Sequence, residues 1–425
     1  MSSLAQRLAR AAYSLLLRLL QPRYVLRLQR RGRVEPLYRH AIDERLGAYE
    51  GAPSSGWVWV HAVSLGETRA AAALIDALRV LRPGLRLLLT HGTATGREAG
   101  AEVLREGDLQ AWLPYDTPAI AERFLDHFSP AIGVLMETEV WPNLLRAAQA
   151  RSLPMVLANA RLSVKSQRQG RRLAALMRPA AQSLSLVLAQ TEADAVRLRD
   201  AGAANVQVSG NLKFDMSPDP ALVALGHVWQ AGLQRSVLLA AVTREGEEAM
   251  LLAAWQHVPD PRPLLLVVPR HPQRFEEVAA LVAGAGFTLA RRSSWGDAPS
   301  AEATNAQVWL GDSMREMALY YGVARVALLG GSFAPLGGQN LIEAAACGCP
   351  VVMGPHTFNF AEAAELSIAA GAGVRAPDMA AAVQVALALL QQPTRLDGCV
   401  KSAQAFSGQH RGAAQRMARE IVALL

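Results

Sequence analysis

The sequence predicts an α/β fold of two Rossmann-like domains, and three features of the chain point to it. At 425 residues the chain is long for one domain, since domains usually hold about 100–200 residues. Hydrophobic residues make up 51% and charged residues 19%, which allows sizeable cores and excludes a disordered chain. Short apolar runs alternate with helical patterns along the whole length. This alternation is typical of parallel sheets covered by helices on both faces.

The apolar runs fall into two groups. The first predicted strand is WVWVHAV at residues 57–63, and a helical pattern follows at 68–81. The other strands of this group are predicted at 85–92, 131–138, 154–160 and 186–191. The second group has predicted strands at 236–242, 263–269, 306–312, 325–332 and 350–355. Since the turn-rich DMSPDP at 215–220 separates them, we expect one domain at residues 41–214 and a second at 215–425.

The positive charge of the chain is concentrated at its N-terminus. The net charge is +7, and residues 1–40 hold nine arginines against one acid, so the remainder carries about −1. Nucleic-acid binders more often carry basic patches through the folded body, so we expect no nucleic-acid partner. Leucines and alanines recur at helical spacing between these arginines, and the longest uncharged stretch, 11–17, is too short to span a bilayer. Residues 1–40 are therefore predicted to form an amphipathic, membrane-associated segment.

Two other interpretations of the N-terminus stay open. One is a partly inserted hairpin that is broken at Pro22, and the other is an ordinary surface helix on the protein body. No small-residue cleavage site follows the apolar stretch, so we do not expect a signal peptide that is removed.

Residues 332–348, SFAPLGGQNLIEAAACG, are the best candidate for a nucleotide site. Gly337 and Gly338 allow the backbone to approach a ligand closely, and Asn340 opens a helix whose free N–H groups favour a phosphate. Glu343, one turn inside that helix, can accept hydrogen bonds from ribose hydroxyls. A helix cap with a packing glycine is the alternative interpretation of the same residues.

Two more segments of the second half follow predicted strands. Arg270-His271-Pro272 can neutralise a phosphate or recognise a base, or form a solvated turn. The backbone N–H groups of GDSMRE at 311–316 can hold a base or phosphate, or the segment simply caps a helix. The absence of GxxxxGK[ST] excludes a P-loop kinase or ATPase, and the GxGxxG of dinucleotide oxidoreductases is also absent.

In the first half, acids stand where predicted strands end. Glu67 lies at a strand–helix junction. Its carboxylate there can act as general base toward a hydroxyl, or it can simply be a helix N-terminal acid that the helix dipole stabilises. Glu137 and Glu139 are two residues apart, which in an extended chain places both on one face. Lys213, one of three lysines in the chain, can place positive charge near a leaving phosphate. No set of His, Cys, Asp and Glu has metal-ligand spacing, so we expect no catalytic metal.

In combination, these motifs resemble the bacterial Kdo transferases, the 3-deoxy-D-manno-octulosonic acid transferases of lipopolysaccharide synthesis. The resemblance covers nearly the whole chain. The segments that carry it are HAVSLGE (61–67), METEVWPNL (136–144), ANARLS (158–163), GNLKFD (210–215), PRHPQRF (269–275), GDSMREM (311–317) and GGQNLIEAAACGCPVVMGPHTFNF (337–360). The chain departs from the family's usual pattern at Arg315, where glycine is frequent, at Gln339 and Ala344, and in the segment 240–248.

The resemblance implies a GT-B glycosyltransferase with two facing Rossmann-like domains, at the cytoplasmic face of the inner membrane. It implies an inverting, metal-independent transfer of Kdo from CMP-Kdo to the lipid A precursor lipid IV(A), with no further cofactor. By position, Glu67 matches the family's catalytic base, and Glu137 and Lys213 match residues that support the transition state. The residues that match the CMP-contacting segments are Pro269, Arg270, Met314, Arg315, Glu316, Asn340, Leu341, Ile342 and Glu343.

Two rival functions are weighed against this one. A nucleotide-sugar epimerase of the same fold needs no lipid acceptor, so residues 1–40 argue against it. A membrane-bound binding protein without catalysis has no need of Glu67, Asn340 or Glu343, and all three are present.

Overall fold

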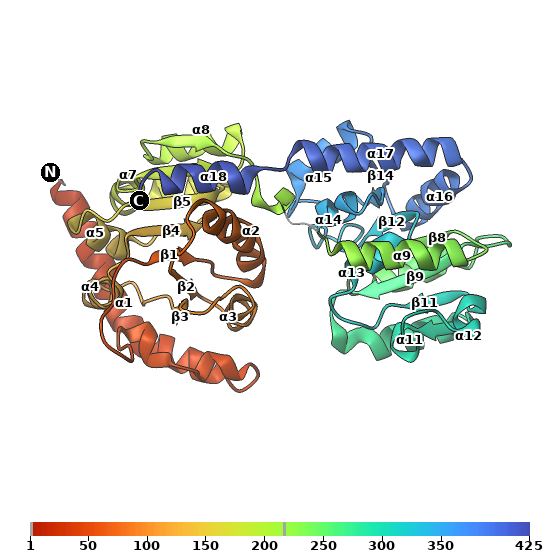
Figure 1. Ribbon diagram of the computed structural model, residues 1–425, viewed down its shortest axis with the longest axis horizontal. Helices are drawn as coiled ribbons and strands as arrows, with labels where there is room; N and C mark the ends of the chain where they lie inside the picture. Colours follow the sequence, from red (N-terminus) through yellow and green to blue (C-terminus); the bar gives the residue numbers. More distant parts are fainter. Residues whose placement is uncertain (1–2, 216–217) are drawn as a thin grey trace. The chain divides into compact units, whose positions relative to one another are not determined.

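The computed structural model describes residues 3–215 and 218–425, and the chain divides into two compact units (Figure 1). Unit 1 comprises Met1–Met216 and Arg411–Leu425, and unit 2 comprises Ser217–His410. Each unit holds a seven-stranded sheet in which the described pairings are parallel. The predicted α/β class with two Rossmann-like domains is confirmed.

The sheet of unit 1 has the order β3-β2-β1-β4-β5-β6-β7. Its strands are β1 (Val58–His61), β2 (Leu87–His91), β3 (Leu109–Trp112), β4 (Ile132–Met136), β5 (Met155–Ala160), β6 (Leu186–Ala189) and β7 (Val206–Val208). The chain builds outward from β1 to β3 and then returns to β4 on the other side of β1. The carboxyl ends of β1 and β4 therefore lie beside a topological switch point, where open α/β sheets bind ligands.

Helices cover both faces of this sheet (Figure 1). They are α1 (Leu4–Arg31), α2 (Leu65–Leu81), α3 (Ala94–Ala101), α4 (Pro118–Phe128), α5 (Pro142–Ala150), α6 (Val164–Arg172), α7 (Ala174–Gln182), α8 (Glu192–Ala201) and α18 (Ala413–Val422), with short 3-10 helices η1 (Pro36–Arg39), η2 (Ile42–Leu46) and η3 (Leu212–Asp215). Alternate residues of β1 face opposite cores: Trp59 packs with Phe124 of α4, and Val60 packs on the side of α2 and α18.

The last helix, α18, belongs to unit 1, so the expected second domain of 215–425 is too long at its end. Met417 and Ile421 are fully buried in the same core as α2. The Asp215 carboxylate accepts hydrogen bonds from the Gly412 and Ala414 N–H groups, which fixes the start of the helix. The apolar positions of α18 recur at helical spacing, and they cover a face of the first sheet that would otherwise be exposed. This burial favours the packing of the last residues of the chain on unit 1.

The sheet of unit 2 has the order β10-β11-β9-β8-β12-β13-β14. Its strands are β8 (Val237–Thr243), β9 (Leu264–Pro269), β10 (Leu289–Arg291), β11 (Val308–Leu310), β12 (Val326–Leu329), β13 (Val351–Met353) and β14 (Gly373–Arg375). The switch point of this sheet lies between β8 and β12. Its helices are α9 (Pro220–Gly232), α10 (Glu247–Trp255), α11 (Phe275–Gly284), α12 (Ala301–Asn305), α13 (Met317–Val323), α14 (Leu341–Ala346), α15 (Ala361–Ala369), α16 (Met379–Leu390) and α17 (Pro393–Gln409), with η4 (Pro272–Arg274) and η5 (Arg292–Ser294).

Every strand predicted from an apolar run is present, usually one to three residues shorter at an end. The strands that the sequence did not indicate are β3, β7, β10 and β14, and these are the two edge strands of each sheet. The predicted turn at 215–220 lies partly outside the described residues.

The N-terminal segment forms the helix α1 and docks on unit 1 through polar groups of one face. A capping box between Ser3 and Gln6 starts it, and it continues through Pro22, so no hairpin forms there. The Tyr13 hydroxyl donates to Asp116 at 3.0 Å, and the Ser14 hydroxyl donates to Asn143 at 3.1 Å. The opposite face is apolar and exposed, with the exposed leucines Leu4, Leu8, Leu15, Leu16, Leu19 and Leu26. Within residues 3–215 and 218–425, no helix is both long and apolar enough to cross a membrane.

Candidate active site

Glu67 lies in the first turn of α2, directly after the carboxyl end of β1. Its carboxylate accepts hydrogen bonds from the Val63 N–H at 2.9 Å and from the Ser64 hydroxyl at 3.0 Å, so it also caps the helix. Burial raises the pKa of Glu67 above its usual value, the Val63 N–H opposes this, and the negative charge of Glu137 adds to it. Glu67 therefore caps α2 and also presents an oriented carboxylate at the switch point.

Glu137 follows β4, the neighbour of β1 at the switch point. It has a φ of 56°, in the left-handed region, so the chain is not extended there and the condition under which Glu137 and Glu139 would share one strand face is not met. The Glu137 side chain is 7% exposed and accepts a hydrogen bond from Arg161 Nε at 2.9 Å. The bend at Glu137 redirects the chain so that both carboxylates remain close to Glu67.

Glu139, which the sequence analysis named beside Glu137 without assigning it a role, is a further carboxylate of this site. Burial raises its pKa to about 7, and the negative charges of Glu67 and Glu137 contribute. Its Oε2 lies 3.8 Å from Nε2 of His61, the last residue of β1. Burial lowers the pKa of His61 to about 3, so the imidazole is neutral and the contact is not an ion pair.

Lys213 lies in η3 and brings positive charge to the same carboxylates. Burial lowers its pKa, while the negative charges of Glu137 and Glu67 oppose the shift. Asn159, whose φ is 52°, accepts a hydrogen bond from the Leu212 N–H at 3.0 Å and so ties η3 to the end of β5. The sequence-predicted residues Glu67, Glu137 and Lys213 thus meet at one place, together with Glu139 and Arg161.

In unit 2 the loops after β8 and β12 are tied together at their switch point by a buried acid. The Glu247 carboxylate accepts hydrogen bonds from the N–H groups of Arg244 at 2.9 Å, Gly331 at 2.6 Å and Phe333 at 3.0 Å. Its neighbour Glu248 forms a two-pronged ion pair with Arg274, at 2.7 and 3.1 Å. Glu247 therefore ties the loops after β8 and β12 together, and Glu248 holds η4 beside α10.

The residues that match the CMP-contacting segments differ in what they can offer a ligand. Arg270 follows β9 and is exposed, as are Met314 and Arg315. Arg315 has a φ of 66°, a conformation that suits glycine, which explains why the family often has glycine there. Glu316 is engaged by Arg292 at 2.9 Å and by Ser313, so it supports the loop. Pro269 closes β9 within the buried sheet.

The segment after β12 is held by the chain's own contacts. Gly337 and Gly338 have φ of 92° and 75°, and a Cβ on Gly337 would overlap Phe358 and Asn359. The close approach expected for a ligand is therefore made, at Gly337, by the 358–359 segment.

The short helix α14 begins at this segment. Asn340 caps it by accepting from the Ile342 N–H at 3.1 Å, and the side chains of Leu341 and Ile342 are buried in the core. These two residues can meet a ligand only through the backbone, while Glu343 is half-buried.

No group of three or more His, Cys, Asp and Glu residues that could hold a metal ion occurs within the described ranges. Cys347 and Cys349 are buried and Cys399 is partly buried, and none of the three is in a disulfide.

Comparison with known proteins agrees with the motifs. The family model of 3-deoxy-D-manno-octulosonic-acid transferase (kdotransferase) matches residues 40–216. The chain is 48% identical over 423 residues to the 3-deoxy-D-manno-octulosonic acid transferase of Bordetella pertussis, and the match covers 96% of this chain and 98% of that protein. This chain belongs to the Kdo transferase family. It is accordingly a glycosyltransferase of lipopolysaccharide synthesis, and the carboxylates at the switch point of unit 1 are the candidate catalytic groups of a Kdo transferase.

Solved structures place the fold of this Kdo transferase among GT-B proteins. HepE of Anabaena in complex with UDP matches with a TM-score of 0.57 and 16% identity, covering 87% of this chain and 100% of that chain. UDP-GlcNAc 2-epimerase of Neisseria meningitidis matches with a TM-score of 0.57 and 16% identity, covering 86% and 99%. Since an epimerase shares the fold, the fold alone does not separate transfer from epimerisation.

Proposed function

We propose that this Kdo transferase moves Kdo from CMP-Kdo to a hydroxyl of lipid IV(A), with inversion at the sugar and without a metal ion. The observation that supports it best is the meeting of Glu67, Glu137, Glu139 and Lys213 at the switch point of unit 1. Family membership supplies the sugar, and the resemblance of the motifs suggests the donor nucleotide and the acceptor.

Glu67 is the proposed general base. The acceptor oxygen attacks C2 of Kdo, the bond from C2 to the CMP phosphate oxygen breaks, and CMP leaves with the bonding electrons. The acceptor proton passes to the Glu67 carboxylate, which two hydrogen bonds hold in place and which retains free lone pairs. Partial burial raises the pKa of Glu67, and a carboxylate with a raised pKa is a stronger base near neutral pH.

The other charges of the cluster suit the transition state. Positive charge develops on the sugar as the bond to CMP breaks, and the carboxylates of Glu137 and Glu139 can stabilise it. Lys213 can offset the negative charge of the departing phosphate. Burial lowers the pKa of Lys213, and the negative charges of Glu137 and Glu67 oppose that shift. These charges come from side chains, which is why the proposed transfer needs no metal.

In unit 2 we assign the nucleotide to the crevice beyond β8 and β12. Arg270 and Arg315 are exposed cations on loops that follow strands, and they suit the phosphate of CMP. The backbone of the segment at Asn340, Leu341 and Ile342, together with the Glu343 carboxylate, suits the ribose. Inorganic phosphate and cytidine titrations against the Arg270→Ala variant would check the division of these roles.

The membrane surface is the proposed location, at the cytoplasmic face of the inner membrane. The exposed leucines of α1 form an apolar face bordered by arginines, which is the composition of helices that lie in the membrane interface. A lipid acceptor resides in that membrane, so docking through α1 would bring the enzyme to its substrate.

The test is a reaction of the purified protein with CMP-Kdo and lipid IV(A), with and without EDTA. The proposal expects lipid-linked Kdo and free CMP in equal amounts, an inverted linkage by NMR, and a rate that EDTA leaves unchanged. Consumption of a nucleotide sugar with no transfer, and an altered sugar stereocentre, would instead establish the epimerase. Binding of CMP with no turnover of any donor would establish an inactive binding protein.

A further inference from the structure

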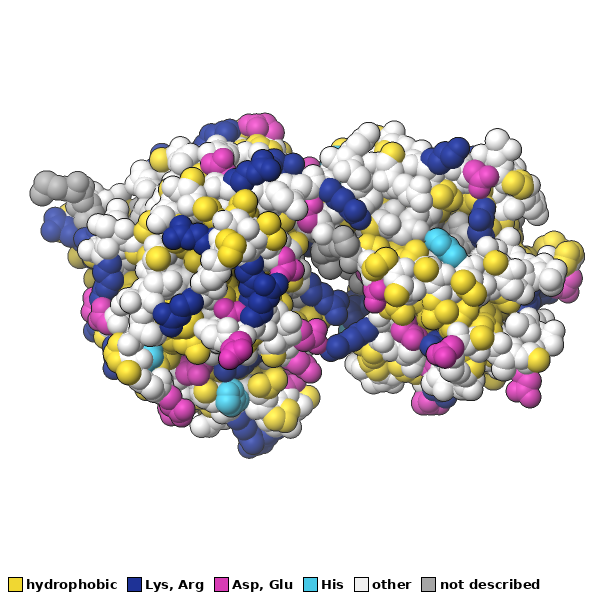
Figure 2. Space-filling view, viewed as in Figure 1, with side chains coloured by type: hydrophobic (Ala, Val, Ile, Leu, Met, Phe, Trp, Pro, Cys, Tyr) yellow, Lys and Arg dark blue, Asp and Glu magenta, His cyan; other side chains and the backbone are white. Residues whose placement is uncertain are grey.

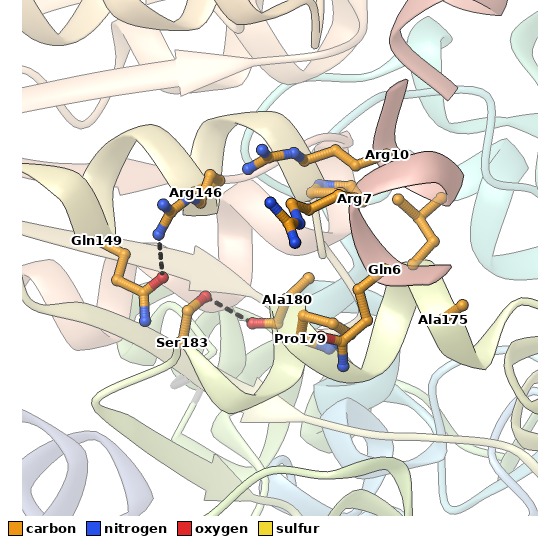
Figure 3. A pocket seen from close by; sticks show the side chains of 11 residues that line it. Gln6, Arg7, Arg10, Arg146, Gln149, Ala175, Pro179, Ala180 and Ser183 are labelled. Atoms are coloured by element: carbon orange, nitrogen blue, oxygen red, sulfur yellow. Dashed lines mark hydrogen bonds between the residues drawn. The ribbon is translucent and has the colours of Figure 1, made fainter. Parts of the chain in front are cut away.

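A pocket lies between α1, α5 and α7 of unit 1, outside the carboxylate cluster (Figure 3). Its volume is about 90 Å³, room for a small group larger than a single water molecule. The residues that line it are Gln6, Arg7, Arg10, Pro142, Arg146, Gln149, Ala175, Leu176, Pro179, Ala180 and Ser183. Figure 3 shows the three arginines together along one side and Pro179, Ala180 and Ser183 along the other.

The charge of this pocket is entirely positive. Arg7 and Arg10 come from α1 and Arg146 comes from α5, and no acid lines the pocket. Within the described residues none of the three takes part in an ion pair, and Arg146 donates to the neutral Gln149 at 3.0 Å. The sequence has no Asp or Glu at residues 1–34 or 140–191, which include α1, α5, α6 and α7. By contrast, the face of unit 1 in Figure 2 mixes basic, acidic and apolar side chains.

Three guanidinium groups at one pocket repel one another unless an anion joins them. A guanidinium carries planar pairs of N–H donors that match the oxygens of a phosphate, and such charge-assisted bonds are among the strongest in proteins. The other wall is made by Leu176, Pro179 and Ala180, which suits the carbon atoms attached to a phosphate rather than a free ion. The pocket is therefore built for an organic phosphate.

The position of the pocket on α1 indicates where that phosphate comes from. Arg7 follows Gln6 and precedes Leu8, whose side chain is 60% exposed on the apolar face of the helix. One side of α1 thus offers leucines to an acyl layer, and Arg7 lies between that side and the one that meets α5 and α7, where Arg10 and Arg146 line the pocket.

We propose that this pocket binds the phosphate of an anionic phospholipid in the bilayer, through Arg7, Arg10 and Arg146. The inference rests on the membrane contact of α1 given under the proposed function, and it adds a specific lipid site to it. The site anchors α1 against α5 and α7 when the enzyme is on the membrane, so it favours bilayers that carry negatively charged phospholipids.

The test compares two double variants that lose the same charge. Arg10→Gln with Arg146→Gln removes two pocket arginines, whereas Arg23→Gln with Arg27→Gln removes two exposed arginines of α1 that do not line the pocket. Binding is measured by co-sedimentation with phosphatidylcholine vesicles with and without phosphatidylglycerol. Each variant loses the general attraction of two charges, about fivefold per charge. The pocket variant is expected to lose at least about tenfold more on phosphatidylglycerol, because it also loses charge-assisted hydrogen bonds.

Equal losses in the two double variants would overturn the proposal, because they would show diffuse charge alone. Tight binding of soluble glycerol phosphate by the wild type, with no preference for phosphatidylglycerol vesicles, would overturn the lipid source. Thermal unfolding checks that both variants are folded, and Arg10→Lys with Arg146→Lys keeps the charge and is expected to bind with intermediate affinity. Kdo transfer by the wild type is measured separately, so a failure of the transferase proposal leaves the vesicle result to be judged by itself.

Discussion

At the residue scale, the central feature is a set of carboxylates in which neighbouring negative charges add to the pKa rise that burial causes at Glu67 and Glu139. Glu139 has a pKa of about 7 through burial and the negative charges of Glu67 and Glu137. Because the coupling between two charges is mutual, ionised Glu139 also disfavours ionised Glu67. Of the two neighbouring carboxylates, Glu137 is the one whose negative charge adds to the raised pKa of Glu67.

The pH profile of transfer tests this coupling. A general base works only when ionised, so kcat/KM is expected to fall as the pH falls through the pKa of Glu67. Glu139, whose pKa is about 7, is largely protonated where Glu67 titrates, so Glu139→Gln is expected to leave the acidic limb in place. Glu137→Gln removes a negative charge that adds to the raised pKa of Glu67, so the acidic limb is expected to move to lower pH. An acidic limb that stays in place in Glu137→Gln, measured at saturating and subsaturating CMP-Kdo, would contradict the coupling.

Lys213 is expected to act on the transition state more than on the ground state. Lys213→Ala removes a cation that lies among the carboxylates, and kcat is expected to fall by about 10²–10³ with CMP affinity nearly unchanged. Lys165→Ala, at an exposed position of α6, is the matched control and should behave as wild type. A fall in CMP affinity that accounts for the whole loss would show that Lys213 only holds the nucleotide.

Some site residues follow from the sequence and others do not. Glu67 and Lys213 stand in segments whose chemistry and family resemblance both indicate catalysis. Glu137 lies near Glu67, but its left-handed φ of 56° cannot be deduced from a strand pattern. Gly337 was predicted to face a ligand, whereas its partner is the 358–359 segment, 21 residues further along the chain. Contacts between segments that are far apart in the sequence cannot be predicted from the spacing of apolar residues.

At the element scale, the strands that were missed share a physical cause. An inner strand of a parallel sheet is buried on both faces and reads as an apolar run, as β5 does with every residue buried. The edge strands β7, β10 and β14 are three residues long and partly exposed. Their sequences therefore carry polar residues and resemble loops, and only hydrogen bonding to the neighbouring strand makes them strands.

The docking of α1 depends on a buried carboxylate. Burial raises the pKa of Asp116 to about 6, and the Tyr13 hydroxyl and the N–H groups of Asn143 and Leu144 partly offset that rise. The folded state thus binds the Asp116 proton more tightly than the unfolded chain does. The contribution of Asp116 to the stability of the folded protein is fully present below its unfolded pKa near 3.8. This contribution is lost as the pH rises through the folded pKa of about 6.

Tyr13→Phe removes a donor from this carboxylate and is expected to cost about 1.5–3 kcal/mol at pH 8, where Asp116 is ionised, and less at pH 5. Tyr49→Phe is the matched control, because the Tyr49 hydroxyl is buried and has no hydrogen-bond partner among residues 3–215 and 218–425. It should be neutral or slightly stabilising. Urea unfolding at the two pH values measures both, and an equal cost at pH 5 and pH 8 would contradict the role of ionised Asp116.

At the scale of the whole molecule, the chain builds two α/β units and then completes the first with its last helix. The alternation of apolar runs was enough to predict two Rossmann-like domains and a division near residue 215. The return of residues 411–425 was not predicted, because nothing in an amphipathic helix says which of two sheets it covers. In the structure Met417 and Ile421 are buried in the same core as α2, so α18 covers the sheet of unit 1.

This assignment predicts which unit a core substitution weakens. Ile421→Ala is expected to cost about 2–5 kcal/mol and to lower the unfolding transition of unit 1, although the residue is four from the end of the chain. Leu389→Ala, in the core of unit 2, should lower the other transition. Hydrogen exchange during denaturation assigns each transition to its unit, and a loss of protection in unit 2 on Ile421→Ala would contradict the division.

The central claim is that Glu67 removes the acceptor proton, and the direct measurement is Kdo transfer by Glu67→Gln beside CMP binding by the same variant. Glutamine can keep its one oxygen as acceptor for the Val63 N–H and turn its amide N–H toward the Ser64 hydroxyl oxygen as donor, so α2 should remain capped. Glu98→Gln, at an exposed position of α3, is the matched control. The account predicts that Glu67→Gln loses about 10²–10⁴ in kcat with CMP affinity and fold retained, whereas Glu98→Gln is unchanged. Equal kcat in wild type and Glu67→Gln would contradict it.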